Sequence, residues 1–269
     1  MSSDTTYHVR PAAAAPPGPR VKPQPKVSAL SSPFTYNPSD DGTDENLLIL
    51  LHGLGDTQVA FGKLGRSLNL PQTATLALRA PAQIPYLYED AFQWYPSFDH
   101  LGELIAQPNP TPALDYVLKV LDHLTRDCAW PPHHIHLFGF AQGGSVAAES
   151  ALKWWRRELD VQKGPTSSEA RPLGSVVSVG GPLLSYPTLQ TVCPTPILVF
   201  RRLPPAEDAL ASEALAAFRK GFSLVVEAKR SGEGMPRSKD EWYPIMKFWS
   251  ERLGRRQVEG LYEVMSGQS

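Results

Sequence analysis

Two glycines frame the segment of this chain whose spacing is closest to that of a catalytic motif. Gly139 and Gly143 flank Ala141 in the sequence Gly-Phe-Ala-Gln-Gly-Gly, which follows a strand-like run and opens a helical pattern. At such a junction Gly-x-Ser-x-Gly is a nucleophile elbow, whose middle serine attacks a carbonyl carbon. The glycines keep side chains out of a sharp turn that strains the middle residue. Ala141 has no side-chain oxygen, so this elbow supplies no nucleophile.

With three other segments, this one resembles the acyl-protein thioesterases and related carboxylesterases. Residues 51–56, Leu-His-Gly-Leu-Gly-Asp, resemble the family's loop after the first central strand, which helps to form the oxyanion hole. Residues 79–81, with 93–96 and Asp99 after them, are similar to its Trp-containing substrate loop. Residues 174–181 resemble the strand after the elbow. The resemblance covers about residues 45–254 and implies an α/β-hydrolase fold: one domain with a mostly parallel central sheet flanked by helices.

The resemblance also implies a histidine and a carboxylate that this chain lacks at the expected places. A triad needs an imidazole as base and a carboxylate to orient it, and on this fold both follow the nucleophile. All seven histidines lie at or before His136, and Met235 or Pro236 stands at the base position. The acid position falls near Leu203. We therefore predict a pseudo-hydrolase. The alternatives are an active carboxylic ester or palmitoyl-protein thioester hydrolase with non-standard residues, or an engineered Ser→Ala form.

Other polar residues offer weak substitutes for the triad. Ser145 lies one helical turn after Ala141 and is expected to point into packing, and Ser178 lacks an evident base. His52 lies next to the oxyanion-type loop, where a structural role is favoured. The histidines of 133–136 suggest zinc only weakly, because alternate strand residues share a face and no Asp or Cys has ligand spacing. We expect no metal and no cofactor.

Binding is the property that we expect to survive. Backbone N–H groups of Leu54 and Gln142 depend on loop geometry and a helix start, so they can still hold a carbonyl oxygen or an anion. Four aromatic residues are candidates for an apolar acyl-binding groove, with simple core packing as the favoured alternative. These residues are Phe92, Trp94, Tyr95 and Phe98.

Short apolar runs alternate with helical patterns, which is the signature of an α/β fold. The strand-like runs lie at 47–51, 73–78, 135–140, 174–179 and 196–200. Residues 47–51 are apolar on both faces, as expected of a central parallel strand. Residues 112–126 carry one apolar stripe at helical spacing, and 243–253 reads as a closing helix.

The ends of the chain read as tails. Residues 1–44 are rich in Pro, Ala, Ser and Gly, which predicts a disordered segment before a hydrolase domain at 45–254. Residues 255–269 are expected to form a C-terminal tail. The proline-rich part also fits a ligand for proline-binding modules, although a solvated tail is favoured.

Charge and cysteine content limit the classes of partner. The chain has 26 Lys and Arg against 27 Asp and Glu, so its net charge provides no long-range attraction to nucleic acid. No apolar run approaches the roughly 20 residues that span a bilayer. The two cysteines, Cys128 and Cys193, read as buried thiols in a reducing compartment, and the cytoplasm is the expected location. The expected partners are an acyl or lipid ligand or a protein; a structural subunit contacting others through 153–157 and 252–256 is a further alternative.

Overall fold

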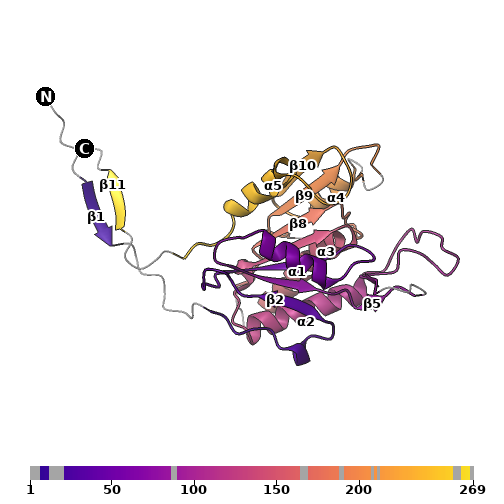
Figure 1. Ribbon diagram of the computed structural model, residues 1–269, viewed down its shortest axis with the longest axis horizontal. Helices are drawn as coiled ribbons and strands as arrows, with labels where there is room; N and C mark the ends of the chain where they lie inside the picture. The colour runs from indigo at the N-terminus through magenta and orange to yellow at the C-terminus, as the bar shows by residue number, and fades with distance from the viewer. Residues whose placement is uncertain are drawn as a thin grey trace.

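Seven strands form one mixed sheet in the computed structural model, in the order β10-β9-β8-β7-β3-β4-β2 (Figure 1). The parallel strands are β3 (Asn46–Leu51), β4 (Thr73–Leu78), β7 (Ile135–Phe140), β8 (Ser175–Val179), β9 (Ile197–Arg202) and β10 (Val225–Arg230). β2 (Phe34–Asn37) pairs antiparallel with β4 at one edge. The predicted single-domain α/β-hydrolase fold is confirmed. The structure describes residues 7–11, 21–85, 90–163, 169–187, 191–206, 209–210, 213–256 and 262–266.

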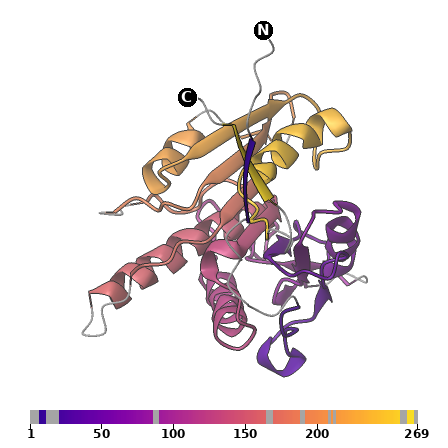
Figure 2. The ribbon, with the colours of Figure 1, turned by 90° about the vertical axis from the view of Figure 1, so that its left-hand side faces the viewer.

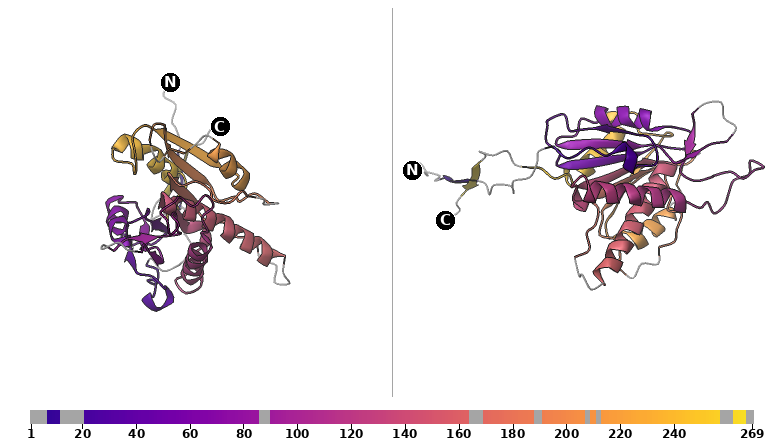
Figure 3. Two further views of the ribbon diagram at one scale, coloured as in Figure 1. Left: turned by 90° about the vertical axis from the view of Figure 1, so that its right-hand side faces the viewer. Right: turned by 90° about the horizontal axis from the view of Figure 1, so that it is seen from below.

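Helices cover both faces of this sheet, as the continuous burial of its central strands requires. On one face, α2 (Thr111–Arg126), α3 (Gln142–Gln162) and α4 (Ala214–Gly221) pack on side chains such as Leu47 and Ile49. On the other face, α1 (Gln58–Ser67) and α5 (Lys239–Ser250) pack on Leu48 and Leu50 (Figures 2 and 3). Every residue of β3 and β4 is buried, which agrees with the apolar runs in the sequence.

The predicted helices are present with small shifts at their ends. The whole expected stripe of α2 is buried: Leu114, Val117, Leu118, Leu121 and Leu124. The closing helix begins at Lys239 instead of residue 243, because the Ser238 hydroxyl accepts a hydrogen bond from the Glu241 N–H and caps it. Ile245, Phe248 and Trp249 on this helix are buried in the core.

Short elements complete the described part of the chain. β5 (Ala82–Gln83) pairs with β6 (Phe92–Gln93), and 3₁₀ turns lie at η1 (Val27–Ala29) and η2 (Pro132–His134). β1 (Tyr7–Pro11) pairs antiparallel with β11 (Tyr262–Ser266), and this ribbon lies apart from the main sheet in Figures 1 and 3. Both cysteines are buried free thiols, as predicted. Among the described residues, no helix has the length and apolar character to cross a bilayer.

Residues 21–44, which precede the predicted domain boundary at residue 45, pack against the domain. The Lys22 N–H donates to Asp44 Oδ2 (2.9 Å), and the Lys26 N–H donates to His123 Nε2 (3.0 Å). Leu30 is buried in the core, and β2 extends the sheet. Amino-acid composition does not indicate that this segment is ordered, because the edge strand β2 and the arm at 21–33 need only a few anchoring contacts. The proline-rich residues 12–20 and the end residues 267–269 lie outside the described part of the chain.

Candidate active site

The elbow predicted around Ala141 is present between β7 and α3. Ala141 has φ 48° and ψ −117°, a conformation that residues other than glycine rarely adopt. Its N–H donates to the Val179 carbonyl oxygen (2.8 Å), and its carbonyl accepts from the Ser145 N–H (3.1 Å). These bonds hold the strained residue between a strand end and a helix start. The apex therefore has the backbone geometry of a nucleophile elbow, with a methyl group in place of a nucleophile.

The two elbow glycines are required by close approach of backbone to backbone. A Cβ atom at Gly139 would lie 2.0 Å from the carbonyl oxygen of Gly143. A Cβ atom at Gly143 would lie 2.3 Å from the carbonyl oxygen of Leu51, at the end of β3. Both distances are far inside van der Waals contact. The loop after β3 is thus packed directly on the elbow, which brings two of the four motifs that carry the resemblance into one place.

A third motif reaches the elbow through the side chain of Gln142. Its Oε1 accepts from the Trp94 N–H (2.9 Å), and its Nε2 donates to the Tyr95 carbonyl (2.9 Å) and to Ser97 Oγ (2.7 Å). Three hydrogen bonds from one buried amide fix the Trp-containing loop over the start of α3. The sequence predicts only a backbone role for Gln142, because its position beside the elbow carries no signal for a role of its side chain.

Three of the four aromatic groove candidates are buried core residues. Phe92, Trp94 and Tyr95 belong to the main hydrophobic cluster, whereas Phe98 is 53% exposed. The indole N–H of Trp94 donates to the His52 carbonyl oxygen (2.8 Å). This arrangement agrees with the core-packing alternative for the three buried rings and leaves Phe98 at the surface.

His52 is held in a structural role by both ring nitrogens. Nδ1 lies 2.7 Å from the Gly53 carbonyl oxygen, so it carries the proton, and Nε2 accepts from the Ala80 N–H (3.0 Å). Burial lowers the pKa of His52, which keeps the ring neutral. Neither nitrogen is left to take a proton from a nucleophile.

The two serines near the elbow are enclosed by packing. Ser178 is fully buried and donates to the Gly181 carbonyl oxygen (2.9 Å). Ser145 is also fully buried, with the Tyr95 hydroxyl as its neighbour. Neither hydroxyl faces the surface, in agreement with the packing role that we expected for Ser145.

An arginine joins the two segments in which the resemblance implies the acid and the base. Arg202 ends β9, one residue before Leu203, and its side chain is 2% exposed. Its guanidinium donates to carbonyl oxygens of Ser231 (2.7 Å), Gly234 (3.0 Å) and Met235 (3.1 Å). The sequence predicts no role for Arg202, which neighbours the acid position near Leu203. The structure makes it the group that holds the 231–235 loop.

Glu241 on α5 completes this arrangement. Its carboxylate lies 2.5 Å from Arg202 Nη1 and accepts from the Arg237 N–H (2.7 Å). These hydrogen bonds lower the pKa of Glu241 to about 2. Glycines at 232 and 234 with positive φ let the loop turn back onto the guanidinium. Charge pairing, not an imidazole and a carboxylate, therefore links the two segments.

The predicted oxyanion-type donors lie on the two segments that meet at the elbow. Gln142 is the first residue of α3, where N–H groups have no intrahelical acceptor. Leu54 follows Gly53, whose added Cβ would lie 2.8 Å from the Phe140 ring. Their role as donors to a ligand stays a prediction.

The histidines of 133–136 are used within the protein. His134 Nδ1 donates to the Glu45 carbonyl oxygen (2.8 Å), and His136 Nδ1 lies 2.8 Å from Ser175 Oγ. Burial lowers the pKa of His136 to about 3, so that ring is neutral. Within the described ranges, no three His, Cys, Asp or Glu side chains are grouped to hold a metal ion.

Comparisons with known proteins agree with this geometry. Residues 36–160 match the protein-family model for phospholipase/carboxylesterase. The uncharacterized hydrolase UM10204 of Mycosarcoma maydis is 40% identical over an alignment of 237 residues that covers 85% of this chain and 86% of that protein. The uncharacterized hydrolase C9G1.08c of Schizosaccharomyces pombe is 28% identical over 84% of this chain and 93% of its own length.

Solved structures show the same fold at lower identity. Esterase PE8 is 21% identical, with a TM-score of 0.62 over 83% of this chain and 99% of its own. Acyl-protein thioesterase 2 of Zea mays is 19% identical, with a TM-score of 0.61 over 83% of this chain and all of its own (100%). The chain belongs to the phospholipase/carboxylesterase family of α/β-hydrolases.

Proposed function

We propose that this hydrolase-family protein does not hydrolyse esters or thioesters by a catalytic triad, and that it acts by binding an acyl ligand or a protein partner. The observation that carries the proposal is Ala141, a residue without a nucleophile at the apex of an otherwise intact elbow. An elbow kept under backbone strain but without its serine retains the scaffold of the site and not its chemistry.

Two further features support the loss of triad chemistry. Every histidine of the sequence lies at or before His136, so none follows the elbow to act as the base. Arg202 links the segments that hold the acid and base positions by hydrogen bonds to the 231–235 loop. Its guanidinium is permanently protonated, so it cannot accept a proton from a serine. His52, whose carbonyl oxygen packs against the elbow at Gly143, has both ring nitrogens engaged in hydrogen bonds.

Binding is supported by backbone groups that do not depend on the triad. The N–H groups at the start of α3 and in the loop after β3 remain beside the elbow, where they suit a carbonyl oxygen or an anion. Binding of this kind needs no membrane span, and a cytoplasmic location is part of the proposal.

Hydrolysis of short- and long-chain p-nitrophenyl esters and of a palmitoyl-thioester peptide tests the proposal. We expect the unmodified protein and its Ala141→Ser variant to remain at the buffer background. The Ala141→Gly variant is the matched control for any effect of changing the elbow backbone, and thermal unfolding checks that each variant is folded.

The measured rates distinguish three kinds of site. Turnover by the unmodified protein overturns the proposal in favour of a hydrolase with non-standard catalytic residues. Turnover by Ala141→Ser alone means that a base and an acid are present, so that Ala141 is the one missing part of a working esterase. Background rates in every protein, including an Ala141→Ser, Met235→His double variant, support a site that cannot be restored by one or two side chains.

A further inference from the structure

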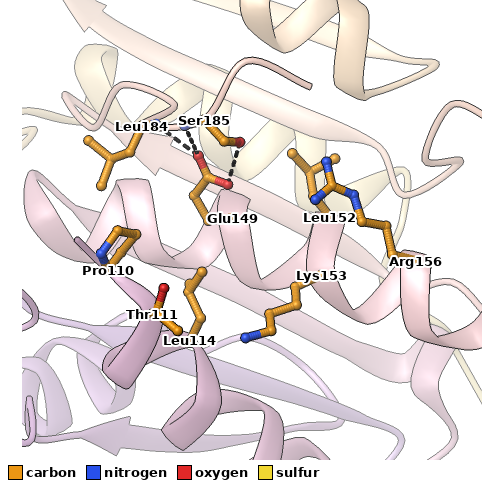
Figure 4. A pocket seen from close by; sticks show the side chains of 9 residues that line it. All are labelled: Pro110, Thr111, Leu114, Glu149, Leu152, Lys153, Arg156, Leu184 and Ser185. Carbon is orange, nitrogen blue, oxygen red and sulfur yellow. Dashed lines mark hydrogen bonds between the residues drawn. The ribbon is translucent and has the colours of Figure 1, made fainter. Parts of the chain in front are cut away.

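A pocket of about 430 Å³ lies on the helical face that carries α2 and α3 (Figure 4). Its walls are the start of α2, the middle of α3 and the loop after β8. The lining residues are Pro110, Thr111, Leu114, Glu149, Leu152, Lys153, Arg156, Leu184 and Ser185. Glu149 is about two helical turns beyond Ala141. The size is within the range of small-molecule sites.

The floor of the pocket is apolar. Leu114 projects from α2 toward α3, Leu152 is a buried residue on the side of α3 that faces Gly221, and Leu184 contributes from the loop (Figure 4). Residues 149, 152, 153 and 156 share one face of α3, so a single helix presents both apolar and charged groups to the same space. A ligand with an apolar body would bury that body on the leucines.

The acidic group in the wall is already satisfied by the protein. The Glu149 carboxylate accepts from the N–H groups of Leu184 (2.8 Å) and Ser185 (2.7 Å) and from the Ser185 hydroxyl (2.7 Å). Glu149 is 5% exposed, and its oxygens face the loop. Its charge therefore fixes the wall of the pocket and leaves little acceptor capacity for a cationic ligand.

The two basic groups differ in their pairing. Lys153 extends toward α2 and forms an ion pair with Asp115 (2.5 Å). The side chain of Arg156 runs back along α3 beside Leu152, and its guanidinium has no acidic partner in the part of the chain that the structure describes. An unpaired guanidinium beside an apolar floor suits a carboxylate, which it can bind with two parallel hydrogen bonds.

We propose that this pocket binds a small amphipathic carboxylate, with its apolar body on Leu114, Leu152 and Leu184 and its carboxylate on Arg156. A single negative charge fits better than a phosphate dianion, because the carboxylates of Glu149 and Asp115 lie close by and repel additional charge. None of the lining residues belongs to the elbow at 139–143, and this binding does not depend on whether the protein hydrolyses esters.

Calorimetric titration of the full chain with decanoate tests this proposal. The matched probes are 1-decanol, which is neutral, decyltrimethylammonium, which is cationic, and decyl phosphate, which carries more negative charge. We expect saturable binding of decanoate and about tenfold weaker binding of the other three, since a hydrogen-bonded charge is worth roughly one decade in affinity.

Three variants assign the binding to the pocket. Arg156→Gln should weaken decanoate about tenfold and leave decanol unchanged, because only the charged contact is lost. Arg156→Lys keeps a positive charge, so its affinity for decanoate should lie between that of the unmodified protein and that of Arg156→Gln. Lys163→Gln is the control: it removes a 72% exposed cation at the end of the same helix, outside the pocket, and should have no effect.

Several results would overturn the proposal. They are absence of saturable decanoate binding, equal binding of decyltrimethylammonium, or equal loss in Arg156→Gln and Lys163→Gln. Tighter binding of decyl phosphate than of decanoate would replace the carboxylate by a phosphate ligand. Each protein is first shown to unfold at an unchanged temperature, and ester hydrolysis is measured separately, so failure here is distinguishable from failure of the proposed function.

Discussion

The guanidinium of Arg202 and the carboxylate of Glu241 lie 2.5 Å apart, and together they hold the loop that would carry a catalytic histidine. Arg202 reaches three carbonyl oxygens of that loop from the end of β9, where the resemblance implies the catalytic acid. In a triad hydrolase these two segments are linked by a hydrogen bond between carboxylate and imidazole. Here an ion pair and backbone contacts provide the link, which keeps the loop ordered without catalytic groups.

Replacing Arg202 by Met should strongly destabilise the protein. The substitution leaves Glu241 and three loop carbonyls without their donor in a site where the arginine side chain is 2% exposed. Removing one partner of a buried ion pair costs roughly 3–5 kcal/mol. Urea unfolding measures this loss, and Arg230→Gln, a nearby arginine with exposed contacts, should change stability by less than about 0.5 kcal/mol. Equal effects of the two substitutions would show that Arg202 does not anchor the loop.

The Arg202–Glu241 pair should also make stability depend on acid pH. Hydrogen bonds from Arg202 and from the Arg237 N–H lower the pKa of Glu241 from its ordinary 4.5 to about 2. The Glu241 carboxyl therefore binds a proton more readily in the unfolded chain than in the folded protein. The stabilisation from the ionised carboxylate is fully present above pH 4.5 and is lost as the pH falls through about 2. In urea unfolding across this window, Glu241→Gln should have a flatter pH profile than the unmodified protein. Parallel profiles would contradict the prediction.

Much of the fold could be predicted because its causes are local and periodic. Residues 47–51 form a central strand because both faces are apolar, and the stripe of α2 is buried as helical spacing requires. The edge strand β2 and the arm at 21–33 could not be predicted in this way. The strand β2 is only partly buried, at Phe34, Thr35 and Tyr36. The arm is held by polar hydrogen bonds to Asp44 and to His123, and His123 is distant in sequence.

The candidate site was predictable at the elbow and not beyond it. Gly139 and Gly143 are required by backbone contacts, so their spacing alone indicates the turn. The roles of Gln142 and Arg202 arise from partners that lie 45 to 48 and 29 to 39 residues away in sequence, and a single sequence gives no signal for such pairs. Resemblance located the acid and base segments, but it did not identify the group that joins them.

Removing one Cβ atom from the elbow and adding one to it should have opposite effects on the stability of the protein. Ala141→Gly removes a Cβ at φ 48° and should stabilise the protein by about 1 kcal/mol. Gly143→Ala places a Cβ 2.3 Å from the Leu51 carbonyl oxygen and should unfold the elbow or prevent soluble expression. Differential scanning calorimetry measures both. A destabilised Ala141→Gly variant would mean that the conformation at the apex is not strained.

Gln142→Ala should loosen the Trp-containing loop without disturbing the sheet. The substitution removes three hydrogen bonds to Trp94, Tyr95 and Ser97, at a cost of roughly 1–3 kcal/mol. Hydrogen exchange should then accelerate in residues 94–97 while amides of β3 and β7 stay protected. Gln72→Ala is a control for loss of a glutamine amide far from the elbow, where it bonds to Arg256. Unchanged exchange in 94–97 would contradict the role assigned to Gln142.

Truncation at the amino terminus should separate the packed arm from the residues before it. A chain that begins at residue 21 keeps the contacts of Lys22 with Asp44 and of Lys26 with His123, together with β2, so its urea midpoint should be close to that of the full chain. A chain that begins at residue 45 loses β2, Leu30 and the Asp44 anchor and leaves β4 as an unpaired edge. Such an edge favours aggregation, which size-exclusion chromatography detects. If the shorter chain were as stable and monodisperse as the longer one, residues 21–44 would not belong to the folded domain.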